Sequence, residues 1–194
     1  HQYYHHFDKK SYEIMNNKNE FYSNNYCINK SLVKPPGKKA TYKELNPSKH
    51  AKLKSIVDYV SKNDDDNNNL LPCLMFVFSR SKCDQYANDC DCKLLEGKEC
   101  VDACNLYDEY VRRYIGSDAE KLEQIYKIRT YIQKGIAIHH SGLLPILKEI
   151  IEILFSKKYI KILFVTETFS VGINMPTRCV VFKDLKKFDG DDER

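Results

Sequence analysis

Apolar runs separated by polar turns dominate the second half of the chain. Residues 160–165 read IKILFV and residues 179–182 read CVVF, and both are rich in β-branched and aromatic side chains. The run LLPCLMFVF at 70–78 has the same character, and the short run GIAIHH at 135–140 ends in two histidines. Continuous apolar runs of this length are typical of strands buried in a parallel sheet. We therefore predict four strands, and we expect those at 160–165 and 179–182 to be buried.

Helical spacing of apolar residues fills the intervals between these strands. Residues 50–62 carry apolar side chains at helical spacing, and residues 82–133 are mostly helical in pattern. The stretch at 141–157 repeats the pattern, with Ser141 as a plausible N-cap. Gly135 is placed to close the preceding helix. The alternation of strand and helix predicts an α/β fold, with a parallel sheet, right-handed crossovers and helices on both faces.

Length and composition allow one full-sized domain plus an appendage. The chain has 194 residues with 42% hydrophobic content, which is enough for a real core. Residues 1–69 are polar and aromatic and end in the low-complexity run NDDDNNN, so we predict a partly structured linker there. The folded domain is predicted over 70–194. No apolar run approaches the roughly 20 residues of a membrane helix, so we expect an intracellular protein with no membrane partner.

Eight cysteines raise the question of a metal site or a disulfide framework. In a chain with this lysine- and asparagine-rich composition we expect reduced thiols. Cys90, Cys92, Cys100 and Cys104 lie within CDCKLLEGKECVDAC, and four thiolates can close a tetrahedral zinc site. Structural zinc, however, uses ligands two to four residues apart in two knuckles, whereas this run has a helical pattern. We therefore predict helix cysteines and no metal.

Polar residues follow two of the predicted strands directly. Ser79 and Arg80 follow the strand at 70–78, and Thr166, Glu167 and Thr168 follow the strand at 160–165. Ligands of open α/β sheets bind at the carboxyl ends of strands, where hydroxyls and amides can bond phosphate oxygens without reading bases. The net charge of +4 permits a nucleic-acid partner but does not demand one. The alternative is that the threonines only cap a turn and that Arg80 is a solvated charge.

The pair His139 and His140 invites a metal hypothesis that strand geometry disfavours. Adjacent strand residues face opposite ways, so the two imidazoles cannot easily share one ion. The following Ser141 and Gly142 precede a predicted helix, and helix N-termini attract anions through free amides and the helix dipole. The alternative is that Ser141 is only an N-cap and His140 only a strand-end residue.

Four segments in order resemble the second RecA-like domain of superkiller-type DExH RNA helicases, in helicase superfamily 2. They are LPCLMFVFSRSKCDQYA, GIAIHHSGLLPILKEIIEILF, IKILFVTETFSVGINMPTRCVVF and KKFDG. SYEIMNNKNEFYSNNY resembles the connector that enters this domain from the first lobe. The resemblance implies that 1–69 is an interlobe connector with a low-complexity insertion and that 70–194 is the second RecA-like domain, ending before motif VI.

The resemblance also implies roles for individual residues. Those expected at the RNA backbone are Ser79, Arg80, His140, Ser141, Gly142, Thr166, Glu167 and Thr168. Gly172 and Asn174 are expected to reach the nucleotide side of the cleft between the lobes. No GxxxxGK[ST] loop and no Asp-Glu-x-His box are present in these 194 residues, so ATP with Mg²⁺ would be held mainly by the first lobe. The isolated chain is therefore expected to be inactive.

The activity implied by this resemblance is ATP-dependent unwinding of RNA, or movement along it, in the full protein. The expected partners are single-stranded RNA, the first RecA-like lobe, and the RNA exosome with its cofactor complex, in the cytoplasm or nucleus. One alternative is a DNA helicase of the same superfamily, because motifs that contact only the phosphates of a strand do not distinguish ribose from deoxyribose. Another is a non-catalytic RNA-binding or interaction module that keeps the fold without the enzyme.

Overall fold

The computed structural model divides the chain into two compact units, His1–Tyr59 and Val60–Arg194. It describes residues 2–5, 11–16, 18–22, 49–61, 70–169 and 175–183. The first unit contains an antiparallel pair, β1 (Gln2–His5) and β2 (Ser11–Met15). Helix α3 (Lys49–Ser61) begins in the first unit and ends in the second, which confirms the helix predicted over 50–62.

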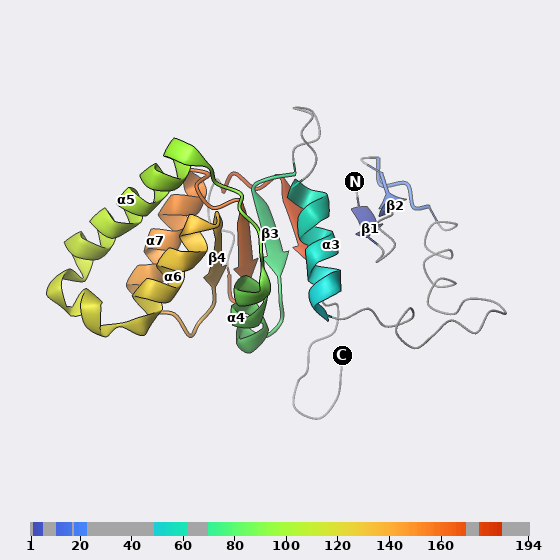
Figure 1. The fold of residues 1–194 in the computed structure, drawn as a ribbon. Helices are drawn as coiled ribbons and strands as arrows, with labels where there is room; N and C mark the ends of the chain where they lie inside the picture. The colour runs from blue at the N-terminus through green and yellow to red at the C-terminus, as the bar shows by residue number, and fades with distance from the viewer. Residues whose placement is uncertain are drawn as a thin grey trace, which may run out of the picture. The chain divides into compact units, whose positions relative to one another are not determined.

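Four parallel strands form the sheet of the second unit, in the spatial order β4-β5-β3-β6 (Figure 1). They are β3 (Cys73–Phe76), β4 (Ile136–His139), β5 (Ile162–Val165) and β6 (Cys179–Phe182). Each strand lies inside an apolar run predicted to be a strand. The parallel sheet with its connecting helices confirms the α/β, RecA-like fold class.

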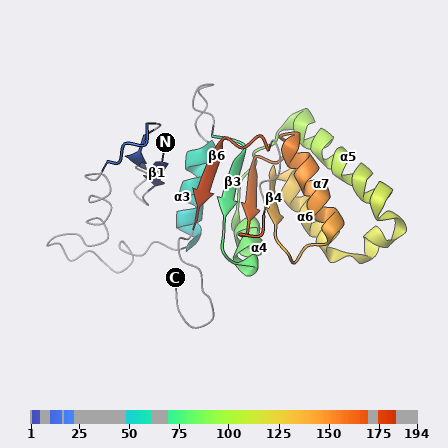
Figure 2. The ribbon, with the colours of Figure 1, turned by 180° about the vertical axis from the view of Figure 1, so that it is seen from behind.

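The helices of this unit cover the sheet and gather toward its β4 edge (Figures 1 and 2). They are α4 (Arg80–Asp89), α5 (Gly97–Tyr114), α6 (Glu123–Gln133) and α7 (Pro145–Ser156), with a 3-10 helix, η1 (Gly116–Lys121), between α5 and α6. Gly135 follows α6 with a φ of +79°, a left-handed conformation that suits glycine and ends the helix. None of the helices in the described ranges is both long and apolar enough to span a bilayer.

Two adjacent histidines show that helices cover both faces of the sheet. His139 Nε2 lies 2.8 Å from Glu152 Oε1 on α7, while His140 Nε2 lies 3.2 Å from Asp84 Oδ2 on α4. Because successive strand residues point to opposite faces, α7 and α4 must lie on opposite sides of the sheet. This confirms the predicted arrangement, and it also shows that the two imidazoles have separate partners.

The register of the strands brings three carboxyl ends to one level. Val165 on β5 pairs with Phe76 on β3 and with His139 on β4. The residues that follow β3, β4 and β5 therefore emerge at the same edge of the sheet. This is where ligands of parallel sheets bind.

Strand β6 differs from the prediction of a buried strand. Val180 is 48% exposed and Phe182 is 56% exposed, whereas every residue of β4 and β5 is buried. Within the described part of the chain β6 pairs with β3 alone, so it is an edge strand. The aromatic ring of Phe182 is partly covered by stacking on Phe76, with ring centroids 5.2 Å apart. The apolar composition of the run therefore predicted the strand but not its burial.

Candidate nucleic-acid interface

Three short segments meet at the carboxyl edge of the sheet: 79–80 after β3, 140–142 after β4, and 166–168 after β5. The backbone N–H of Thr166 donates to His139 O at 3.3 Å, which ties the third segment to the last residue of β4, directly before the second segment. A Cβ atom added to Gly142 would come within 3.7 Å of Arg80 Cδ, so the first and second segments also touch. The structure therefore brings residues predicted from separate motifs onto one surface.

Ser79 and Arg80, which follow β3, differ in role: Ser79 caps helix α4, and Arg80 is exposed. Ser79 is the N-cap of α4, and its Oγ accepts a hydrogen bond from Lys82 N at 3.4 Å. Such a cap satisfies one of the free amides at the helix start. Arg80 is the first residue of the helix and its side chain is exposed. The guanidinium is therefore the more accessible group of the two.

The threonines that follow β5 differ in accessibility. Thr166 is only 3% exposed, and its Oγ1 lies 2.9 Å from Thr168 Oγ1. Thr168 and Glu167 are exposed. The carbonyl of Thr166 also accepts a hydrogen bond from Phe169 N at 3.0 Å, which closes a tight turn. Thr166 therefore fixes this turn, and Thr168 presents its hydroxyl to solvent.

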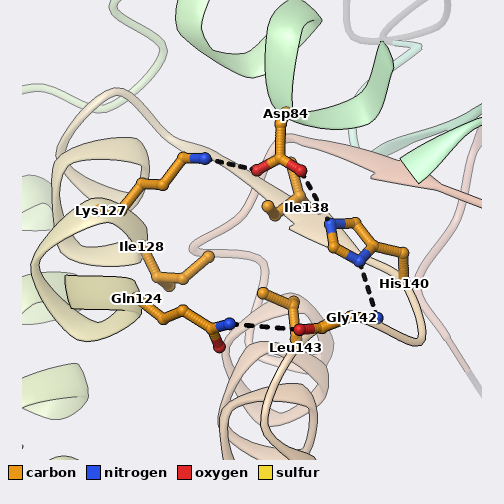
Figure 3. A pocket seen from close by; sticks show the side chains of 8 residues that line it. All are labelled: Asp84, Gln124, Lys127, Ile128, Ile138, His140, Gly142 and Leu143. Carbon is orange, nitrogen blue, oxygen red and sulfur yellow. Dashed lines mark hydrogen bonds and ion pairs between the residues drawn. The ribbon is translucent and has the colours of Figure 1, made fainter. Parts of the chain in front are cut away.

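His140 is a buried residue that shapes the turn after β4. Its Nδ1 accepts a hydrogen bond from Gly142 N at 3.0 Å (Figure 3). Its Nε2 faces Asp84 Oδ2 at 3.2 Å without the geometry of a hydrogen bond. Burial lowers the pKa of this imidazole, and the Asp84 carboxylate acts in the opposite direction. A neutral ring is what the contact with Gly142 requires, because a protonated Nδ1 cannot accept.

The turn itself consists of exposed Ser141 and Gly142. A Cβ at Gly142 would lie 3.1 Å from both Cε1 and Nδ1 of His140, so the close approach of backbone to ring favours glycine. The prediction that Ser141 is the N-cap of the next helix is wrong. Helix α7 begins at Pro145 and its N-cap is Leu144, which makes no side-chain cap. Proline is favoured as a first helical residue because it lacks the amide hydrogen that would otherwise need a partner.

A small cavity of about 230 Å³ lies behind this turn (Figure 3). Its lining residues come from α4, α6, β4 and the turn, and they are Asp84, Gln124, Lys127, Ile128, Ile138, His140, Gly142 and Leu143. Lys127 Nζ lies 2.5 Å from Asp84 Oδ1, so this ion pair joins α6 to α4 next to His140. The buried imidazole therefore faces a carboxylate whose charge is already paired.

Gln124 holds the turn from the α6 side. Its Nε2 donates to Gly142 O at 3.2 Å, and its Oε1 accepts from Leu144 N at 3.2 Å. Both amide atoms are thus bonded to the backbone that leads into α7. Sequence reasoning missed Gln124, Asp84 and Lys127. The available signal was the helical spacing of 124, 127 and 128 on the helix that runs directly into β4.

Two of the predicted residues, Gly172 and Asn174, lie outside the described residues. Within the described ranges, no three His, Cys, Asp or Glu side chains are grouped so as to hold a metal ion. The four cysteines proposed as a cluster are also divided. Cys90 and Cys92 lie between α4 and α5, outside any helix, so the prediction that they are helical is wrong, whereas Cys100 and Cys104 lie on α5.

Comparison with known proteins finds no matching family model but clear relatives. The chain is 41% identical over 161 residues, 79% of its length, to the antiviral helicase SKI2 of Saccharomyces cerevisiae. It is 44% identical over 131 residues, 65% of its length, to the exosome RNA helicase MTR4 of Homo sapiens. An uncharacterized helicase of Schizosaccharomyces pombe is 34% identical over 188 residues, 94% of the chain. The chain spans only 11%, 12% and 18% of these three proteins, respectively.

Proposed function

Because the chain belongs to the superkiller-type DExH helicase family, we propose that it forms the second RecA-like domain of an ATP-dependent RNA helicase. One observation carries the proposal: a cation, two hydroxyls and a glycine turn are exposed together at the carboxyl ends of three neighbouring strands. Arg80, Ser141, Gly142 and Thr168 supply these groups. These groups can bind phosphate and sugar without contacting a base, so the surface suits the backbone of a nucleic acid whatever its sequence.

The eight residues expected at RNA then take two kinds of role. Arg80, Ser141 and Thr168 contact the strand through exposed side chains, and Gly142, whose backbone N–H and C=O already bond to His140 and Gln124, leaves room for the strand to approach. Ser79, His140 and Thr166 are half-buried or buried and position these groups through their hydrogen bonds. The exposed carboxylate of Glu167 would repel a phosphate, but it can accept a hydrogen bond from a ribose 2′-hydroxyl. Glu167 is therefore our candidate for distinguishing RNA from DNA.

ATP with Mg²⁺ would bind mainly to the first lobe of the same protein. The 194 residues contain no GxxxxGK[ST] phosphate-binding loop, and the main role proposed for them is to hold RNA. Gly172 and Asn174 are proposed to lie on the nucleotide side of the cleft. The two lobes would close on ATP and RNA and open again after hydrolysis. Because the closed and open states would bind RNA with different affinity, this cycle would drive movement along the strand.

The names of the relatives support a role in RNA decay. One is an exosome RNA helicase and others are superkiller complex proteins. We propose that the full protein likewise assists the RNA exosome within the cell, in the cytoplasm or nucleus. The two alternatives are a DNA helicase of the same superfamily and a non-catalytic interaction module.

A strand-displacement assay on the full-length protein tests the proposed function. Duplexes with a single-stranded RNA or DNA track are incubated with ATP and Mg²⁺, and the released strand is measured. Displacement on the RNA track only is expected. Displacement on DNA to the same extent would favour the DNA helicase, and the absence of both displacement and RNA-stimulated ATP hydrolysis would favour the interaction module. The isolated 194-residue chain is the matched control and is expected to hydrolyse no ATP.

Replacing Thr166 with alanine is expected to lower the affinity of the full-length protein for RNA several-fold. The change removes the hydroxyl that orients Thr168, and a neutral hydrogen bond is worth about 0.5–1.5 kcal/mol net. The loss should be the same for RNAs of different sequence, because a backbone contact carries no base information. Fluorescence anisotropy with labelled RNA measures it. Normal RNA affinity in a properly folded variant would show that Thr166 serves only to cap the turn.

Replacing Gln124 with glutamate is also expected to lower RNA affinity several-fold. The new carboxylate can still accept from Leu144 N, but it cannot donate to Gly142 O, so the turn loses one of its two ties to α6. Nucleotide affinity and the thermal midpoint should change little. The matched control is Gln133→Glu, which makes the same charge change at an exposed position of the same helix. Equal losses in both variants would indicate a general charge effect and no positioning role for Gln124.

A further inference from the structure

A pair of cysteines lies in the non-helical segment between α4 and α5. Cys90 Sγ and Cys92 Sγ are 3.2 Å apart. Cys90 is 3% exposed, whereas Cys92 is half-buried and its two neighbours, Asp91 and Lys93, are exposed. Cys92 is thus the more exposed residue of the pair, and the thiol of Cys90 lies in contact with it.

The segment that carries the pair is held at both ends. Lys134 Nζ donates to Cys90 O at 3.0 Å, and Leu94 N donates to Lys134 O at 2.9 Å. The side chain of Leu95 is fully buried. These contacts fix the backbone on both sides of Cys92 to the end of α6 and hold the two thiols in place.

The surroundings of the pair favour a thiolate at Cys92, the more exposed of the two residues. The contact with Cys90 lowers the pKa of the Cys92 thiol; burial and the neighbouring Asp91 carboxylate oppose this shift, and the Lys134 ammonium supports it. The thiolate is the reactive form of cysteine, and reactive cysteines combine such a cation with partial exposure. Cys73 and Cys83, by contrast, are fully buried, and burial is the largest cause that raises the pKa of Cys83 to about 12.

We propose that Cys90 and Cys92 form a peroxide-sensitive dithiol that closes reversibly to a disulfide. The Cys92 thiolate attacks one oxygen of hydrogen peroxide, breaks the O–O bond and becomes a sulfenic acid, with hydroxide as the leaving group. The thiol of Cys90, losing its proton, then attacks the Cys92 sulfur and displaces the hydroxyl as water. Two electrons pass from the sulfurs to the peroxide, and any dithiol reductant restores the pair.

This site is separate from the proposed RNA surface. Lys134, which holds the pair in place, directly precedes Gly135 and β4, so the dithiol lies at the amino end of that strand. The residues proposed to contact RNA follow the carboxyl ends of β3, β4 and β5. Oxidation of the pair is therefore expected to leave RNA affinity unchanged, and the proposal does not depend on the helicase function.

Peroxide treatment of the full-length protein tests the proposal. Free thiols are then blocked with iodoacetamide in denaturant, so that the buried cysteines also react, and tryptic peptide 83–93, which contains Cys83, Cys90 and Cys92, is analysed by mass spectrometry. The expected product has lost two hydrogens and carries one blocked thiol, on Cys83. Reduction before blocking should restore three blocked thiols. A peptide whose three cysteines all remain open to iodoacetamide after peroxide treatment would overturn the proposal.

Single variants assign the two roles. In Cys90→Ser the sulfenic acid of Cys92 should persist and be trapped by dimedone, whereas Cys92→Ser should abolish oxidation of the peptide. Cys100→Ser, a half-buried cysteine on α5, is the matched control and should leave the disulfide intact. Dimedone trapping at Cys90 in the Cys92→Ser variant would contradict the assignment of the two roles. Loss of the disulfide in Cys100→Ser would contradict it as well. The thermal midpoint of Cys92→Ser confirms that this variant is folded.

Discussion

Replacing Arg80 with alanine is expected to weaken RNA binding of the full-length protein by about 10- to 100-fold. Hydrogen bonds to charged groups are worth about 1.5–3 kcal/mol, and each 1.4 kcal/mol is a factor of about ten in affinity. Arg80 is exposed at the start of α4 and lies beside Gly142, so its guanidinium can reach a phosphate that also meets the turn. Fluorescence anisotropy with labelled single-stranded RNA, in the absence of nucleotide, measures the effect.

Arg178→Ala is the matched control for this experiment. Arg178 is an exposed arginine directly before β6, at the amino edge of the sheet, so its loss changes the net charge equally. Its substitution should alter RNA affinity less than threefold. The salt dependence gives a second measure, because losing one phosphate contact reduces the slope of log affinity against log salt by about 0.7 for single strands. Equal losses in both variants would mean that Arg80 acts through overall charge and not through contact.

Replacing Ile162 with alanine is expected to destabilise the second unit by roughly 2–5 kcal/mol. Ile162 is fully buried on β5, between Ile136 of β4 and Cys73 of β3. The truncation leaves a cavity that neighbouring strands on both sides can fill only in part. Urea unfolding of the 194-residue chain, followed by circular dichroism, gives the change in the free energy of unfolding.

Val180→Ala provides the comparison on the edge strand. Val180 is also β-branched and lies in a parallel strand, but it is 48% exposed. Its truncation should cost well under half as much as that of Ile162, because it removes fewer carbon atoms and about half of the residue's surface is already in contact with water. Equal costs at the two positions would show that β6 is buried to the same degree as β5.

Local pattern was sufficient to predict the fold class and most of the elements. The apolar runs that became β3, β4 and β5 are short and bounded by polar residues, so they could be distinguished from helices. The rule that ligands bind at strand ends also pointed to the surface that carries Arg80 and Thr168. Both inferences depend on residues close together in the chain, which a single sequence displays.

Side-chain partners from distant segments could not be predicted in this way. Gln124 contacts the turn at Gly142 and Leu144 only because α6 packs beside it, and nothing in the sequence around Ser141 shows that contact. Contacts from distant segments also explain why the predicted N-cap, Ser141, was wrong. Ser141 has the right residue type, but the helix begins at Pro145, which lacks an amide hydrogen, and the N–H of the N-cap residue Leu144 is bonded to Gln124 from another helix.

Exposure of β6 and the conformation around Cys90 were missed for a related reason. The composition of CVVF is that of a strand, but whether a strand is central or at an edge depends on the order of the sheet. The helical pattern of 82–133 likewise does not show that residues 90–95 lie outside any helix. Lys134 holds that segment through Cys90 O, and this contact spans 44 residues of sequence.

The back-to-back histidines at the end of β4 make the length of this strand critical. His139 meets Glu152 on one face and His140 meets Asp84 on the other. Inserting or deleting one residue within β4 would exchange the two faces, so each imidazole would turn toward the wrong helix. Variation among related proteins should therefore preserve the number of residues from Ile136 to Gly142, even where the side chains differ. Surface loops elsewhere in the domain are under no such constraint and are free to change in length.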